Sequence, residues 1–219
     1  MKNKLKNKVV VVTGAGGTLC SEMARNLARQ GVKVALLGRS LEKLKKTEQD
    51  IKQAGGVAIS VSTDVTSEDQ VMAARNKIME TFGPCDILVN GAGGNQPDAV
   101  TTLNEFSDEE LNHVEGVRGF FNLGMKTFAN VIKSNTMGTV IPCFIFGKDM
   151  AKKKSGNIIN IASMNSYRPL SRVGAYGMAK AGIMNFTQWL AVYLAPANIR
   201  VNGIAPGFFL NDRSRKLLT

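Results

Sequence analysis

Tyr176 and Lys180 stand four positions apart in the sequence, and Ser163 precedes the tyrosine by thirteen positions. A tyrosine and a lysine at this spacing share one face of a helix, so the ammonium group can favour the ionised phenol and lower its pKa from about 10. Such a phenol can act as a general acid, and a nearby serine hydroxyl can hold a carbonyl oxygen while it is protonated. The three residues therefore predict the polar half of a carbonyl reduction. The alternative is an ordinary helix with a surface lysine, because a lysine-rich chain also produces this pair by chance.

The elements that must position these residues alternate between strand and helix. Residues 9–13 are a near-continuous β-branched run, which is typical of a strand buried on both faces of a parallel sheet. This alternation predicts an α/β fold, a Rossmann-type doubly wound parallel sheet with helices on both faces, in a single domain over residues 1–219. The expected strands are residues 9–13, 32–37, 57–61 and 86–90; the expected helices are residues 19–30, one that Ser40 caps and Gly55 ends, and one that Ser67 and Gln70 begin as a capping box and Gly83 ends.

Two glycine-rich turns follow the first and the fourth expected strand. Open α/β sheets bind ligands at the carboxyl ends of their strands, and glycines there let the backbone approach a pyrophosphate at a helix N-terminus. The motif Gly-x-Gly-x-x-Gly is incomplete, because Leu19 occupies its last position. The turns predict a dinucleotide site, with a glycine turn that binds no ligand as the alternative. Its candidate residues are Gly14, Gly16, Gly17, Thr18 and Leu19 in the first turn and Asn90, Gly91 and Ala92 in the second.

Composition and charge limit the other classes of function. The 28 basic and 17 acidic side chains give a net charge of +11, which suits an anionic partner. The basic residues follow helix faces without interleaved aromatics, so a nucleic-acid partner is not predicted. The apolar runs are too short to span a bilayer, the start lacks signal-peptide features, and three scattered cysteines and one histidine, His113, make no disulfide or metal pattern. We expect a cytoplasmic protein without a metal site or a membrane partner.

An ordered set of motifs carries a resemblance to a known family. The set is Thr13-Gly14, Asp64-Val65, Asn-x-Ala-Gly at residues 90–93, Ser163, Tyr176-x-x-x-Lys180 and Pro206-Gly207. With it, the chain resembles the short-chain dehydrogenase/reductases over nearly its whole length. Within that family, residues 83–95, 163–165, 185–191 and 205–210 look like the branch of D-mannonate oxidoreductases, also called fructuronate reductases.

The resemblance implies a role for each matching residue. Tyr176 would be the catalytic acid/base, Lys180 would bind the nicotinamide ribose and lower the pKa of Tyr176, and Ser163 would fix the substrate oxygen. Asn135 would hold a water of the proton relay; a helix-interior asparagine bonded to backbone is the alternative. On the cofactor, Asp64 would accept from the adenine amine with Val65 beside it, Asn90, Gly91 and Ala92 would line the adenine-ribose side, and Pro206 and Gly207 would line the nicotinamide side.

The chain also departs from the family's pattern in both glycine-rich turns. Thr18 and Cys20 stand where the family has glycines, and Gly91 replaces the second asparagine of Asn-Asn-Ala-Gly. The first turn must therefore accommodate a Cβ at two positions that the family keeps free of one.

The end of the second expected strand bears on the choice of cofactor. An acidic residue there would bond the ribose 2′-hydroxyl of NAD, but this chain has Arg39 and Ser40. A guanidinium at this point can bind a 2′-phosphate, so we expect NAD(P) with a preference for NADP. Stacking of Arg39 on adenine, or a surface salt bridge, is the alternative, and the D-mannonate branch is commonly NAD-linked.

Two further features follow from the comparison with the family's pattern. The spacing between Asn90 and Asn135 is long, so residues 95–121 are expected to be an insertion and a candidate substrate lid, with a capping box at Ser107 and Glu110. The family continues past Pro206-Gly207, so we expect the C-terminal strand of the sheet to be missing from this sequence.

The predicted reaction is hydride transfer between a nicotinamide cofactor and the carbonyl of an anionic sugar acid, with D-fructuronate and D-mannonate as the best named pair. Arg168, Arg172 and Lys148 are candidate cations for the substrate carboxylate. Reduction of another sugar or a polyol, and a non-catalytic dinucleotide-binding module, are the alternatives. A homo-oligomer, either a dimer or a tetramer, is expected.

Overall fold

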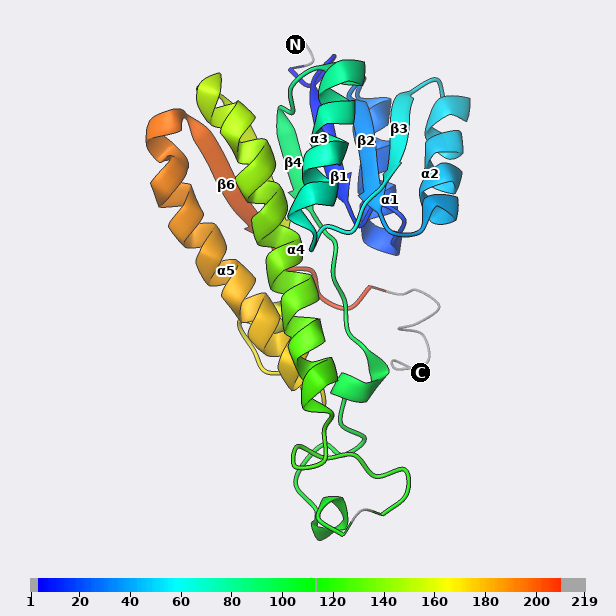
Figure 1. Ribbon diagram of the computed structural model, residues 1–219, viewed down its shortest axis with the longest axis vertical. Coiled ribbons are helices and arrows are strands. Elements are labelled where there is room, and N and C mark those ends of the chain that lie inside the picture. Colours follow the sequence, from blue (N-terminus) through cyan, green and yellow to red (C-terminus); the bar gives the residue numbers. More distant parts are fainter. Residues whose placement is uncertain (1–3, 113, 210–219) are drawn as a thin grey trace.

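The computed structural model describes residues 4–112 and 114–209, which form a six-stranded sheet between two layers of helices (Figure 1). The strand order is β3-β2-β1-β4-β5-β6, and all neighbouring strands are parallel. This order confirms the predicted doubly wound fold, because the chain winds outward from β1 in one direction and from β4 in the other. Among the described residues, β6 pairs with β5 alone.

The strands are β1 (Val9–Thr13), β2 (Lys33–Gly38), β3 (Val57–Ser62), β4 (Ile87–Asn90), β5 (Gly156–Ile161) and β6 (Ile199–Ile204). The α-helices are α1 (Thr18–Arg29), α2 (Leu41–Gln53), α3 (Glu68–Phe82), α4 (Met125–Lys152) and α5 (Gly174–Leu194). The expected bounds of the first four strands and three helices differ from these by no more than a residue or two, which is the usual uncertainty at element ends.

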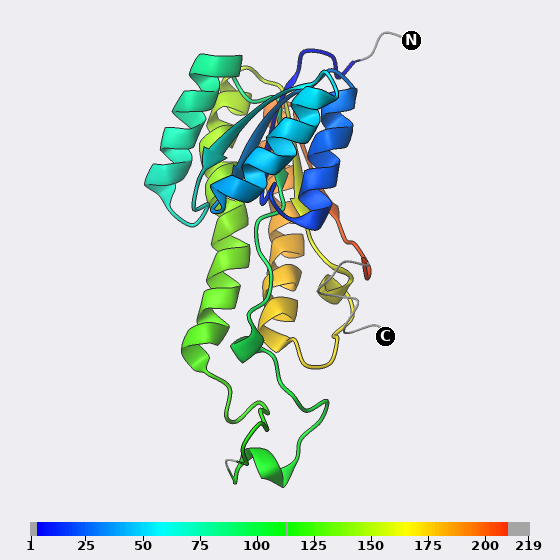
Figure 2. The same cartoon turned by 90° about the vertical axis from the view of Figure 1, so that its right-hand side faces the viewer.

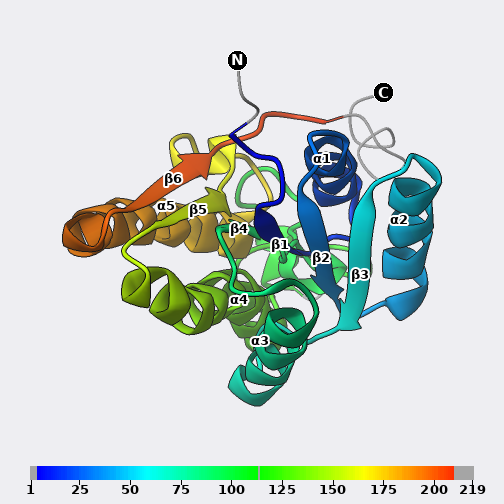
Figure 3. The same ribbon diagram turned by 90° about the horizontal axis from the view of Figure 1, so that it is seen from above.

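Alternate side chains of the central strand face the two helical layers. Val10 and Val12 of β1 pack with apolar residues of α1 and α2, whereas Val9 and Val11 pack with residues of α3, α4 and α5. Seen from above, α1 and α2 lie on one side of the sheet and α3 and α4 lie on the other (Figure 3). The continuous β-branched run of β1 is therefore explained by burial on both faces.

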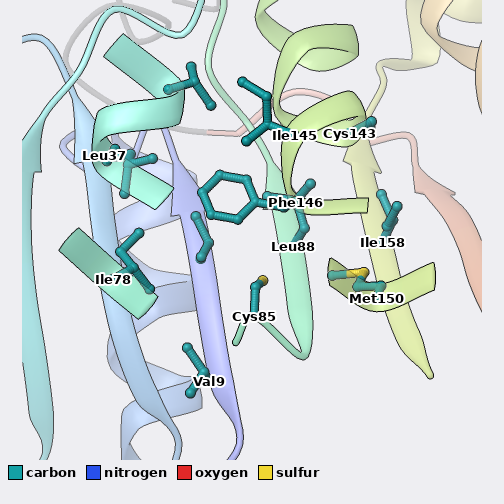
Figure 4. Packing of buried hydrophobic residues seen from close by; sticks show 14 of the residues in the cluster. Val9, Leu37, Ile78, Cys85, Leu88, Cys143, Ile145, Phe146, Met150 and Ile158 are labelled. Atoms are coloured by element: carbon teal, nitrogen blue, oxygen red, sulfur yellow. The ribbon is translucent and has the colours of Figure 1, made fainter. Parts of the chain in front are cut away.

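The core beneath α4 is built around Phe146. This ring is 1% exposed and lies with Leu37 and Leu88 of the sheet and Ile78 of α3 in one apolar cluster (Figure 4). Truncation of a buried phenylalanine to alanine costs about 3–5 kcal/mol, so this ring fixes α4 against the strands. The position of α4 matters because the helix carries Asn135 toward the second glycine-rich turn.

Both predicted capping boxes are only half formed. Ser67 Oγ accepts from the amide of Gln70 at 3.4 Å, but the Gln70 side chain accepts from the amide of Asp64 at 2.8 Å. Ser107 Oγ accepts from the amide of Glu109, and the Glu110 carboxylate accepts from the amide of Phe121 at 2.8 Å. The prediction was wrong for the reciprocal half of each box. The Gln70 and Glu110 side chains accept from a backbone amide of an adjoining loop and not from the amide of the N-cap serine.

The connection from β4 to α4 leaves the body of the molecule and returns to it. It contains the predicted insertion and two short 3₁₀ turns, η1 (Pro97–Ala99) and η2 (Asp108–Glu110). In two perpendicular views it extends past the first residues of α4, away from the sheet (Figures 1 and 2). We refer to residues 95–124 as the arm.

Candidate active site

A cavity of about 670 Å³ opens at the carboxyl ends of the central strands, where the strand order reverses between β1 and β4. Open α/β sheets bind their ligands at this point. Its lining includes nine residues predicted from the sequence, namely Gly14, Gly16, Gly17, Arg39, Ser40, Asp64, Val65, Gly91 and Ala92. It also includes residues that were not among the predicted cofactor-binding residues, namely Gly38, Lys43, Leu44, Thr63, Thr66, Gly93, Gly94, Asn95, Gln96, Pro97 and Ser134.

Gly14 is the point where the two glycine-rich turns touch. Its φ is +67°, and a Cβ there would approach the backbone of Ala92 to 2.8 Å. Both the conformation and the contact therefore require glycine. At Gly16, a Cβ would come within 2.9 Å of the Lys43 Cβ. Without side chains at these two positions, the backbone of the first turn is free to approach a pyrophosphate closely.

Thr13 joins the two turns, and this contact was not predicted. Its Oγ1 accepts from the amides of Gly91 and Ala92 at 3.1 and 3.2 Å. A threonine that closes a run of valines is typical of a strand, so its type alone does not reveal the contact. The only available signal was the parallel pairing of β1 with β4, which places Thr13 beside Asn90.

Thr18 and Leu19 begin α1, for which Gly17 is the N-cap. The N-terminus of a helix attracts a phosphate, which supports the predicted place of this turn in cofactor binding. Neither residue is among those that line the cavity. Any contribution of theirs to the cofactor is thus expected from their backbone amides.

The side chain of Asn90 lies inside the molecule and not in the cavity. It is 1% exposed, and its Nδ2 donates to Asn160 Oδ1 at 2.9 Å and to Cys143 Sγ at 3.1 Å. Asn160 Nδ2 in turn donates to Thr187 Oγ1 at 2.9 Å. The Asn90 side chain therefore joins the sheet to α4 and α5 and does not line the cavity. A contact of Asn90 with the cofactor stays a prediction.

A group of polar and charged residues lies where β2 and β3 end. Arg39, Ser40 and Lys43 line the cavity together, so a second cation stands beside the predicted guanidinium. Across from them, Asp64 Oδ1 accepts from the amide and the hydroxyl of Thr66 at 2.9 and 2.8 Å. These bonds, together with the positive charge of Arg39, hold the pKa of Asp64 below its ordinary value. The carboxylate is therefore ionised and able to accept from a ligand amine.

Ser163 and Tyr176 meet beyond the end of β5, as their spacing predicted. Ser163 begins the 3₁₀ turn η3 (Met164–Ser166), and its Oγ accepts from the amide of Asn165 at 3.2 Å. Tyr176 stands in the first turn of α5, and its hydroxyl lies near the Ser163 side chain, which acts to lower the pKa of the phenol. Two hydroxyl groups thus converge on one point from different elements.

The pKa of Tyr176 differs from the expectation. Burial holds it above its ordinary value, and the nearby Ser163 side chain offsets only part of that effect. The expected lowering by Lys180 is wrong for this structure, because the ammonium lies 5.5 Å from the ring centroid and points elsewhere. Lys180 Nζ donates to the carbonyl oxygen of Ile161 at 2.7 Å. Burial lowers the pKa of Lys180 to about 8.

Asn135 makes the backbone bonds that were the alternative to its predicted role. Its Nδ2 donates to the carbonyls of Gly94 and Val131, both at 2.8 Å, and its Oδ1 accepts from the amide of Gly94 at 3.1 Å. The side chain clamps the second glycine-rich turn, where a Cβ on Gly93 would collide with it. The relay water stays a prediction.

Pro206 and Gly207 lie beside the loop that carries Ser163. The Pro206 carbonyl accepts from the amide of Met164 at 3.0 Å, and Gly207 approaches the Met164 sulfur. The two residues predicted for the nicotinamide side thus lie beside the loop of Ser163. Ser163, Tyr176, Lys180, Pro206 and Gly207 are not among the residues that line the cavity.

The three candidate cations for a substrate carboxylate stand differently. Lys148 is near the end of α4, over the ring of Phe144 at 3.7 Å, and thus at the opposite edge of the sheet from the cavity. The prediction that Lys148 binds the substrate carboxylate was therefore wrong. Arg172 Nε donates to the carbonyl of Thr101 at 2.8 Å and so ties the arm to the segment before α5. Arg168 lies just past η3, close in sequence to Ser163, and remains a candidate.

In residues 4–112 and 114–209, no cluster of three potential metal ligands occurs, and no helix has the length and apolar character needed to cross a membrane. His113 lies outside the described residues. The cytoplasmic location and the absence of a nucleic-acid partner stay predictions.

Residues 8–218 match the family described as short chain dehydrogenase. This chain belongs to the short-chain dehydrogenase/reductase family. Two uncharacterised oxidoreductases are similar to it: one from Haemophilus influenzae, 46% identical over 99% of this chain and 75% of its own length, and one from Bacillus subtilis, 44% identical over 100% and 77%. As a member of this family, the chain is an NAD(P)-dependent oxidoreductase.

Solved structures of other short-chain dehydrogenases have the same fold. A protein from Haemophilus influenza that is provisionally named a D-mannonate oxidoreductase, with bound NAD, has a TM-score of 0.92 at 43% identity and covers 98% of this chain and 75% of its own. An NAD⁺-bound xylitol dehydrogenase has a TM-score of 0.85 at 31% identity, with 98% and 75% covered. The Gly14 cradle and the cavity beside it fit a dinucleotide in this chain as well.

Proposed function

We propose that this short-chain dehydrogenase transfers a hydride between NAD(P) and the carbonyl or hydroxyl carbon of a sugar acid, with D-fructuronate and D-mannonate as the best named pair. The position of the Ser163 hydroxyl near the Tyr176 hydroxyl carries the proposal. One carbonyl oxygen between them can contact both. The sugar acid is favoured by the residues shared with the D-mannonate branch and by the name of the Haemophilus neighbour.

In the proposed reduction, the bound nicotinamide supplies the hydride to the substrate carbon. Ser163 donates a hydrogen bond to the carbonyl oxygen and holds it in place. Tyr176 gives its proton to that oxygen as negative charge develops there; in the reverse direction its phenolate removes the proton. Lys180, one helical turn away on α5, would bind the nicotinamide ribose, as the resemblance to the family implies.

The cofactor preference that we propose is NADP over NAD. Arg39, Ser40 and Lys43 line one end of the cavity, and two cations beside a hydroxyl suit a 2′-phosphate. The NAD in the Haemophilus neighbour argues for use of both cofactors, while a different short-chain oxidoreductase holds NADP. We therefore expect the protein to bind both cofactors and to bind NADP more tightly than NAD.

The test is turnover, followed by nicotinamide absorbance, with D-fructuronate, D-mannonate and a panel of other sugar acids and polyols. Wild type and Tyr176→Phe are compared with both cofactors, and cofactor binding is measured separately by fluorescence. We expect turnover on a sugar acid that falls by on the order of 10²- to 10⁴-fold in the variant, with cofactor binding kept.

Two other results would replace the proposal. Turnover on a polyol but on no sugar acid would favour the second candidate, a polyol dehydrogenase, for which the similarity to the xylitol dehydrogenase speaks. Cofactor binding without turnover on any substrate would leave a dinucleotide-binding module.

A further inference from the structure

Ser163 and Tyr176 stand on different elements, so the contacts between η3 and α5 decide how their hydroxyls meet. One of these contacts is a hydrogen bond, in which Ser166 Oγ donates to the carbonyl oxygen of Lys180 at 2.8 Å. It ties the turn to α5 about one helical turn past Tyr176. A second contact, made by the side chain of Asn165, joins η3 to the residue that directly follows Tyr176.

Asn165 is held in place through both its side chain and its backbone. It is 5% exposed, and its Oδ1 accepts from the backbone amide of Leu170 at 2.9 Å. The backbone amide of Asn165 donates to Ser163 Oγ at 3.2 Å. This bond uses a lone pair of the hydroxyl oxygen, so the hydroxyl proton stays available for a substrate oxygen. The side-chain amide of Asn165 therefore cannot move far without moving the turn that Ser163 begins.

Gly177 gives the side-chain amide of Asn165 its space. A Cβ at position 177 would lie 3.2, 3.3 and 3.4 Å from Nδ2, Oδ1 and Cγ of Asn165. Three nearly equal distances mean that this Cβ would sit over the flat face of the amide group. Gly177 stands inside α5 and is not among the glycines with a positive φ. The close contact, and not the backbone conformation, therefore explains a glycine at this position.

Both residues of this contact are unfavourable for folding. Glycine inside a helix is less stable than alanine. Asn165 Nδ2 is buried and has no acceptor in the part of the chain that the structure describes, and a buried donor without an acceptor is also unfavourable. Two choices against stability at one contact, beside the paired hydroxyls, are typical of a functional site.

We propose that Asn165 and Gly177 are positioning residues of the reaction, and that the packing of the Asn165 side-chain amide on Gly177 sets the separation of the Ser163 and Tyr176 hydroxyls. This role rests on the proposed function, in which one carbonyl oxygen contacts both hydroxyls. A side chain at position 177 would push the amide group away from α5 by a few tenths of an ångström. Because the backbone of Asn165 is bonded to Ser163 Oγ, Ser163 would move with it and away from Tyr176. A displacement of reacting groups by a fraction of an ångström slows a reaction that needs both of them aligned.

The test compares wild type with Gly177→Ala, Asn165→Ala and the double variant. The rate of the chemical step is measured in single turnovers by nicotinamide absorbance, with D-mannonate or, if wild type does not oxidise it, with the sugar acid or polyol that wild type oxidises fastest. Each single change is expected to slow this step about tenfold or more, while the Kd for NAD and NADP stays unchanged. In the double variant the methyl group of residue 177 fills part of the space that the amide group leaves. Its loss in rate should therefore be smaller than the product of the two single losses.

Gly182→Ala is the matched control, because Gly182 lies in the same helix and a Cβ there would meet nothing within 4 Å. This variant should react at the wild-type rate. Alanine is the better helix former, so the Tm of both glycine variants is expected to lie no more than about 3 °C below that of wild type. A slower chemical step in Gly177→Ala then reflects displaced hydroxyls and not a loss of folding.

Two results would overturn the role of this contact alone. One is a Gly177→Ala protein that reacts as fast as Gly182→Ala, and the other is a pair of single losses that multiply in the double variant. A wild type that binds the cofactor but turns over no substrate would overturn the proposed function, and this role with it.

Discussion

The thiol of Cys20 lies against Gly91, in the space that a Cβ on residue 91 would occupy. The two departures from the family's pattern, a cysteine in the first turn and a glycine in the second, are therefore one compensated pair. The thiol is buried, and burial raises its pKa to about 11, so it fills this space as a neutral group.

Replacement of Gly91 by alanine is expected to destabilise the protein by about 1–3 kcal/mol, because the new methyl group collides with the Cys20 sulfur. Cys20→Ala removes the sulfur, so the double variant should be more stable than the sum of the single changes predicts. Cys20→Ser, which keeps an atom at the γ position, is the matched control and should rescue less. Urea unfolding of wild type, Gly91→Ala, Cys20→Ala and the double variant measures the coupling between the two residues. If the effects of the two single changes add up to that of the double variant, the contact is contradicted.

The pH dependence of oxidation should report on Tyr176. Its phenolate must accept the proton in that direction, and burial holds the pKa of Tyr176 above its ordinary value, so the rate is expected to rise with pH into the alkaline range. The Ser163 side chain lowers this pKa, so Ser163→Ala should move the rising limb to higher pH as well as reduce the rate. Ser171→Ala, on the exposed segment before α5, serves as the control. If the rate of Ser163→Ala rises over the same pH range as that of wild type, Ser163 does not influence the pKa of Tyr176.

Lys180 should make the stability of the protein depend on pH. Its pKa is about 8 in the folded chain against an ordinary value of 10.5, so between these values the unfolded chain binds more protons and the free energy of unfolding rises with pH. Relative to Lys180→Met, wild type is expected to gain about 2 kcal/mol between about pH 7.5 and 9.5. Urea unfolding at both pH values checks this. If the difference in the free energy of unfolding between the two proteins is the same at both pH values, the pKa of Lys180 is not lowered in the folded chain.

Arg39 and Lys43 should act on NADP more than on NAD. Each contributes positive charge at the end of the cavity where a 2′-phosphate is proposed, so Arg39→Ala and Lys43→Ala are each expected to weaken NADP binding by about 1–3 kcal/mol and NAD binding much less. Titration by cofactor fluorescence measures both constants, and Lys46→Ala on the outer face of α2 is the control. Equal losses for the two cofactors would support stacking on the adenine instead.

The fold could be predicted because hydrophobic pattern and glycine turns are local signals. The run from Val9 to Val12 and the spacing of Ser163, Tyr176 and Lys180 led to the correct sheet and to the correct meeting point of two hydroxyls. Three other features depend on contacts between distant segments, which no spacing encodes: the inward turn of the Asn90 side chain, the direction of the Lys180 ammonium and the amide that takes the Gln70 oxygen. The pKa of Tyr176 was misjudged for the same reason, since burial is a property of the folded chain.

Thr13 shows how narrow the tolerance of a fully buried strand position can be. Valine has nearly the same shape and an equal preference for strands, so by packing alone the two residues are interchangeable at the end of β1. Only threonine offers an oxygen to the amides of Gly91 and Ala92, and without it two donors would face the cleft unpaired. A sequence could therefore keep every strand, every helix and every reacting group of this enzyme and still lose the spacing between the walls of its cofactor cleft through the exchange of one hydroxyl for a methyl group.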